Sequence, residues 1–169
     1  MLGWWYHNVE GDMDYAGQRW PRYFVWHPLD HISYTVTGRI DGKIEPGTRL
    51  HIREAFQRNP ENLLDLRAEV ESIDSSAAII RKRIAGLTVL RLVNRFTATA
   101  SGTRYVTEMT IGVEGPLGRL LNPLLRRRIL GGARGQAWIR HHVEEIGLLE
   151  HFLPGLYATA AELTPATTP

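Results

Sequence analysis

The chain has 169 residues, 43 % of them hydrophobic and 22 % charged, which predicts one ordinary globular domain and excludes a two-domain enzyme or a disordered chain. It has no cysteine, which excludes disulfides, thiolate metal sites and cysteine nucleophiles, so any metal must bind to His, Asp or Glu. The net charge of +2 does not favour nucleic acid. Neither a signal peptide nor an apolar run of about 18 residues is found, so we expect a cytoplasmic protein without a membrane partner.

Alternating apolar and polar residues predict β-strands in the first two thirds of the chain. Residues 1–18 are expected to form a short helix or an irregular lead-in, and the sequence becomes β-like from Trp20. The predicted strands cover residues 23–26, 31–37, 48–57, 62–73, 77–84, 86–98 and 103–113. A helix remains an alternative for 62–73. The short turns between them favour an antiparallel meander of roughly six strands.

After Gly115-Pro116 the apolar residues recur at intervals of three and four, which is typical of helices. One helix is expected from Pro116, interrupted by Pro123, and a long one over 133–157 that Pro154 ends or kinks. The prediction is one α+β domain over residues 1–163, with a polar tail at 164–169. A curved antiparallel sheet around a long C-terminal helix is the plan of the helix-grip (START or Bet v 1-like) fold, which encloses a cavity.

Glu54 is the first candidate for a functional residue because it lies on the apolar face of its predicted strand, between Ile52 and Phe56. A buried, unpaired carboxylate costs several kcal/mol or takes up a proton, so this one is expected to be paired, bound to metal or functional. A half-buried position near the rim of the sheet is the alternative.

Two further clusters contain histidine. The segment from Trp26 to His31 holds His27, Asp30 and His31 within five positions, although a simple turn at Pro28 is an alternative. The long helix carries His141-His142-Val143-Glu144-Glu145, in which either histidine can share a face with Glu145; a solvated, ion-paired face is the alternative. The helical period does not decide between His141 and His142 as the inward residue.

Together, the three clusters allow a metal site made of His27, Glu54 and either His141 or His142. Two imidazoles, one carboxylate and a water are a known composition of catalytic zinc sites. Asn94 lies on an apolar strand face, where its amide can contact a ligand, and Arg126-Arg127-Arg128 is interpreted as a solvated cluster.

The sequence resembles the 2,4-diacetylphloroglucinol hydrolase family in a set of short stretches. These are Trp4-Trp5, the run from Arg22 to His31, Gly47 to Glu54, Arg140 to Glu145, and Phe152 to Tyr157. The resemblance implies a helix-grip fold, a zinc ion held by three histidines and one glutamate, and hydrolysis of a carbon–carbon bond in an acylated phloroglucinol. By position it implies His27, Glu54 and His141 as ligands, whereas Asn94 stands where another histidine is expected.

The leading hypothesis is therefore a zinc-dependent hydrolase acting on a small aromatic or β-diketone substrate, with a homodimer as a possible assembly. Asp30, His31 and Tyr34 are the candidate catalytic acids or positioning groups. Trp26, Asn94 and Trp138 are the candidate substrate contacts. The alternative is a metal-free protein of the same fold, either a cyclase or a binder of apolar small molecules.

Overall fold

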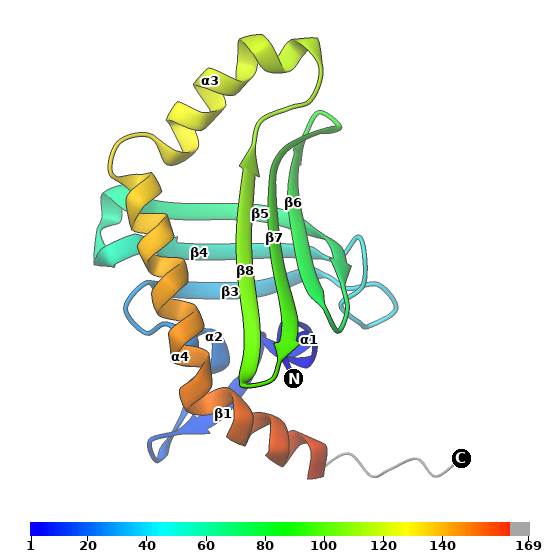
Figure 1. Cartoon of the computed structure of the whole chain (residues 1–169), viewed down its shortest axis with the longest axis vertical. Coiled ribbons are helices and arrows are strands. Elements are labelled where there is room, and N and C mark those ends of the chain that lie inside the picture. Colours follow the sequence, from blue (N-terminus) through cyan, green and yellow to red (C-terminus); the bar gives the residue numbers. More distant parts are fainter. Residues whose placement is uncertain (163–169) are drawn as a thin grey trace.

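The computed structural model describes residues 1–162 and has an α+β architecture, in which an antiparallel sheet packs with a long C-terminal helix (Figure 1). The six strands of this sheet follow one another in space in their sequence order. They are β3 (His31–Gly38), β4 (Arg49–Ala55), β5 (Leu63–Ile73), β6 (Ala77–Ile84), β7 (Leu87–Thr99) and β8 (Gly102–Ile111). The meander predicted from the alternating pattern is therefore confirmed. Residues 63–73 form one strand, β5, and not the helix that was the alternative.

The segment before the sheet differs from the prediction. It contains α1 (Leu2–Asn8), a hairpin of β1 (Asp12–Tyr15) and β2 (Gln18–Pro21), and the short helix α2 (Arg22–Trp26). The expected strand at 23–26 is thus wrong. Aromatic and β-branched residues dominate this segment and favour a strand. The single helical turn of α2, however, buries Tyr23, Val25 and Trp26 together, so tertiary packing overrides the local preference for a strand.

Two 3₁₀ turns and two helices complete the chain. The turns are η1 (Phe56–Arg58) and η2 (Pro60–Asn62), between β4 and β5. The helices are α3 (Pro116–Leu130), with Pro123 inside it, and α4 (Arg134–Glu162). Pro154 lies within α4 and does not end it. The predicted tail at 164–169 falls outside the described residues. No helix of the described part is long and apolar enough to cross a membrane.

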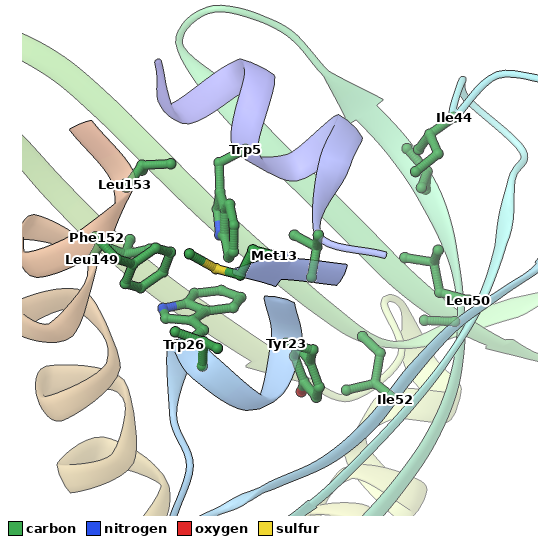
Figure 2. Packing of buried hydrophobic residues seen from close by; sticks show 14 of the residues in the cluster. Trp5, Met13, Tyr23, Trp26, Ile44, Leu50, Ile52, Leu149, Phe152 and Leu153 are labelled. Carbon is green, nitrogen blue, oxygen red and sulfur yellow. The ribbon is translucent and has the colours of Figure 1, made fainter. Parts of the chain in front are cut away.

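The core joins the two ends of the chain. Trp5 of α1 is fully buried and packs edge-to-face on Trp26, with ring centroids 5.4 Å apart, and on Phe152 of α4, at 5.3 Å (Figure 2). Aromatic pairs of this geometry add to the free energy of burial. The N-terminal segment therefore fixes α4 relative to the sheet, an arrangement compatible with a helix-grip plan.

Candidate metal centre

Four buried donors from three elements meet between the sheet and α4. His31, the first residue of β3, is the direct cross-strand partner of Glu54 on β4, so both side chains emerge from the same region of the sheet. His141 and Glu145 lie one turn apart on α4, which places them on one face of the helix. All four residues are at most 8 % exposed.

The distances between these donors suit a single ion. His31 Nε2 lies 3.4 Å from Glu145 Oε2 and 3.8 Å from Glu54 Oε1. His141 Nε2 lies 3.6 Å from Glu145 Oε2 and 3.8 Å from Glu54 Oε2. A tetrahedral zinc site with bonds of about 2.0 to 2.2 Å has donors roughly 3.3 to 3.6 Å apart. The donors form two overlapping groups that are close enough to hold an ion, His31 with Glu54 and His141, and Glu145 with His141 and His142.

Hydrogen bonds at the other ring nitrogen fix the tautomer of both histidines. His31 Nδ1 donates to the backbone carbonyl of Tyr23 at 2.7 Å, and His141 Nδ1 donates to Asp30 Oδ2 at 3.0 Å. In a neutral imidazole the remaining nitrogen then carries a lone pair. Both Nε2 atoms are buried and have no hydrogen-bond partner. They are thus oriented as metal ligands, with the outer hydrogen bonds that usually accompany ligating histidines.

Tyr23 supports this arrangement from α2. Its hydroxyl donates a hydrogen bond to Glu54 Oε1, and its ring stacks on the imidazole of His31, with centroids 3.8 Å apart and planes 3° from parallel. Tyr23 therefore positions Glu54 through its hydroxyl group, and it positions His31 through its backbone carbonyl and its ring.

Without a cation, burial shifts the pKa values of all four donors toward their neutral forms, although Glu145 stays ionised at pH 7. Burial raises the pKa of Glu54 to about 8, with a further contribution from the charge of Glu145, and burial raises the pKa of Glu145 to about 6. Burial also lowers the pKa values of His31 and His141 to about 3. At pH 7 the metal-free centre therefore holds two imidazole lone pairs and the ionised Glu145 beside a protonated Glu54, and a divalent cation would take the place of that proton.

His27, the expected first ligand, lies beside Asp30 and His141, with which it forms a further group of close donors, and its Nε2 is also buried without a hydrogen-bond partner. Its Nδ1 accepts a hydrogen bond from the backbone N–H of Asp30, so its Nε2 carries the proton and points toward Glu144 Oε2, 3.5 Å away. Among the described residues, no group of three close donors joins His27 to Glu54. His31, a candidate catalytic acid or positioning group, lies beside Glu54 and His141.

Asp30, a candidate catalytic residue, contacts His141. Burial opposes its ionisation, but hydrogen bonds from the Gln57 backbone and from His141 keep its pKa below the ordinary value. The Asp30 carboxyl group is therefore ionised at neutral pH. Its carboxylate orients His141.

The structure distinguishes the two adjacent histidines of α4. His141 is 1 % exposed and faces Glu54, whereas His142 lies beside the outer oxygen of Glu145, with its Nε2 3.6 Å from Oε1. His142 Nδ1 donates to the Trp138 carbonyl, and burial lowers the His142 pKa to about 4. His142 is a further donor on the side of Glu145.

An apolar cavity adjoins the carboxyl groups of the centre. Glu54 and Glu145 line it, together with the expected contacts Trp26, Asn94 and Trp138, the expected catalytic residue Tyr34, and mainly aliphatic side chains of the sheet. Asn94 Oδ1 accepts a hydrogen bond from the Thr107 hydroxyl, which leaves its amide hydrogens for other partners.

Comparisons with protein-family models, curated proteins and solved structures gave no match. The geometry of this centre therefore carries the functional argument by itself. Sequence reasoning placed Glu145 beside His141 and His142 on the helix but did not count it among the ligands, and it did not identify Tyr23 as part of the centre. The i, i+4 spacing of His141 and Glu145 was the available signal for the first, and nothing in the sequence placed Tyr23 beside Glu54.

Proposed function

We propose that the protein is a zinc-dependent hydrolase of helix-grip fold that cleaves a carbon–carbon bond in a small acylated phenol or β-diketone. The observation that carries this proposal is the pair of buried, unprotonated Nε2 atoms of His31 and His141, which face Glu54 and Glu145 at 3.4 to 3.8 Å. Such a cluster is costly to bury without a cation.

The donor set favours zinc over the hard cations. Imidazole nitrogens suit zinc and related transition metals, whereas calcium and magnesium prefer oxygen donors alone. His31, His141, Glu54 and Glu145 would hold the ion. When bound, zinc polarises a carbonyl and supplies a nucleophilic hydroxide near neutral pH, the chemistry that an acyl hydrolase needs.

The cavity supports an aromatic substrate. Its walls are mainly apolar, and it opens onto the carboxyl groups, so an apolar ring can lie beside them. Of the three residues expected to act as acids, Tyr34 alone lines this cavity. Burial raises the Tyr34 pKa well above its ordinary value, so its hydroxyl stays protonated and can donate a hydrogen bond to a phenolic or acyl oxygen.

The resemblance to the 2,4-diacetylphloroglucinol hydrolase family supports the choice of substrate class. It covers the segments that contribute Tyr23, His31, Glu54, His141 and Glu145. The ligand set proposed here contains two histidines and two glutamates, where the resemblance implies three and one. Asn94 then needs no role as a ligand.

The test is a zinc titration of the metal-free protein, with metal content measured by mass spectrometry. Wild type should bind one zinc, and His141→Ala should bind none under the same conditions. The control is His51→Ala, which removes a histidine paired with Asp65 on the sheet surface and should bind as wild type does. Zinc-dependent release of the free acid from an acylphloroglucinol would then establish the reaction. A wild-type protein that binds no zinc would contradict the proposal.

The apolar cavity favours a second candidate, a metal-free binder of aromatic small molecules. In that case Glu54 and Glu145 would serve as a polar end to the cavity. Saturable binding of acylphloroglucinols, unchanged by chelator and without turnover, would support this alternative.

A further inference from the structure

The helix α3 exposes a continuous apolar face. Leu117, Leu120, Leu121 and Leu124 follow the i, i+3, i+4, i+7 spacing of one side of a helix, and they are 57, 77, 37 and 66 % exposed. Arg127 and Arg128 continue this side by one further turn. We call these six residues the α3 outer face. Figure 1 shows that α3 lies beyond the ends of β7 and β8 rather than over the sheet.

The opposite side of α3 is the one that packs on the protein. Gly118 is buried so closely that a Cβ there would lie 2.2 Å from the Val113 carbonyl oxygen. The Asn122 side chain accepts from Val113 N–H at 2.7 Å and donates to Val113 O at 3.1 Å. These contacts hold the helix in one orientation, so the leucines are directed outward by the fold.

Charge is strongly concentrated around this helix. The 15 residues of α3 contain four arginines and no acidic residue, so the helix carries +4, whereas the rest of the chain carries −2. Within the part of the chain that the structure describes, no carboxylate lies within ion-pair distance of Arg119, Arg127 or Arg128. The arginines beside the exposed leucines are thus free to bind an external anion.

We propose that the α3 outer face docks on the surface of an anionic lipid membrane. An amphipathic helix with leucines on one side and arginines at its border is the pattern of an interfacial helix, which inserts its apolar side at the level of the headgroups. Basic residues near it bind anionic lipids by charge. The expectation of no membrane partner rested on the absence of a spanning segment, and docking on a surface requires none.

Docking on this face would place the membrane near the apolar cavity. Ile129 and Leu130, at the end of α3, and Arg134, at the start of α4, line that cavity. A membrane-dissolved apolar ligand would then have a short path into the cavity. The docking itself does not depend on the proposed reaction, because the leucines and arginines of the face are separate from the metal donors.

The test uses full-length protein and flotation with lipid vesicles. Vesicles of equal parts phosphatidylglycerol and phosphatidylcholine should carry the protein upward, vesicles of phosphatidylcholine alone should carry much less, and high salt should release it. Leu120→Asp together with Leu124→Asp should weaken binding at least tenfold, since the apolar contact is lost. Arg127→Glu together with Arg128→Glu should also weaken it, and only on anionic vesicles.

Matched controls change exposed residues of the same kinds elsewhere. Ile84→Asp with Leu87→Asp alters exposed apolar residues at the β6–β7 turn, and Arg95→Glu with Arg104→Glu alters exposed arginines on β7 and β8. Both controls should bind vesicles as wild type does. Absence of flotation by wild type, or equal losses in the controls, would overturn the proposal. So would a dimer in light scattering that the Leu120 and Leu124 changes dissociate while vesicle binding is absent, because the face would then bind a second copy of the chain.

Discussion

Replacing Asp30 by asparagine tests how the metal centre is oriented. Asp30 Oδ2 accepts from His141 Nδ1 at 3.0 Å, and Oδ1 accepts from the backbone N–H of Arg58 at 3.2 Å. An asparagine has one oxygen for these two donors. If its NH₂ group faces His141, it favours the tautomer with the proton on Nε2, which can no longer bind a metal.

Loss of such an outer hydrogen bond typically weakens metal binding 10- to 100-fold. We therefore expect Asp30→Asn to lower zinc affinity by this factor, equivalent to about 1.4 to 2.7 kcal/mol. Competition with a chromophoric chelator at pH 7.5 measures the change.

The matched control is Asp65→Asn. Asp65 also pairs with a histidine, His51, at 2.8 Å, but on the exposed side of the sheet. This variant should bind zinc as wild type does. If Asp30→Asn also retained wild-type affinity, the orientation of His141 by Asp30 would be refuted as a determinant of binding.

Three further predictions concern protonation and packing. Zinc affinity should rise about tenfold per pH unit between pH 6.5 and 7.5 and level off above about pH 8. The reason is that Glu54, whose pKa is raised to about 8, must lose a proton to bind the metal. Zinc titrations at several pH values measure this dependence. In the metal-free protein, the unfolded chain ionises Glu54 at lower pH than the folded one, so this carboxyl costs stability as pH rises toward 8. Glu54→Gln removes this cost, so its free energy of unfolding should exceed that of wild type by a difference that grows by about 1.4 kcal/mol per pH unit between pH 5 and 8. Urea unfolding at several pH values measures this difference. The control Glu108→Gln, on the exposed side of β8, should show no such trend. Trp5→Ala should lower the free energy of unfolding by about 3 to 5 kcal/mol, because it leaves a cavity between α1 and α4. Trp20→Ala, at a site that is 37 % exposed, should lower the free energy of unfolding far less. Equal effects of the two changes in thermal unfolding would contradict the described core.

Much of the sheet was predictable because one side of it is buried. The period of two located β5 to β8 to within two residues, since a shift of one residue would turn every apolar side chain to water. The helix α2 was not predictable in this way. A single turn is too short to show a helical period, and its aromatic residues are equally typical of strands.

The centre was predictable only in part. Glu54 was identified because a carboxylate among apolar residues contradicts the burial pattern. The choice between His27 and His31 depends on the backbone around Pro28, where the chain turns before β3 begins, and parity along a strand does not apply there. Glu145 was not counted among the ligands because, on the helix alone, His141 and Glu145 are as typical of a solvated pair as of a buried one.

The candidate donors lie far apart in the sequence, because His31 and Glu54 belong to the first two strands of the sheet whereas His141 and Glu145 belong to α4. During synthesis the sheet leaves the ribosome before α4 does, so two of the four candidate donors are still missing when the sheet can first form. A chain truncated before α4 would therefore lack half of the side chains that could hold an ion.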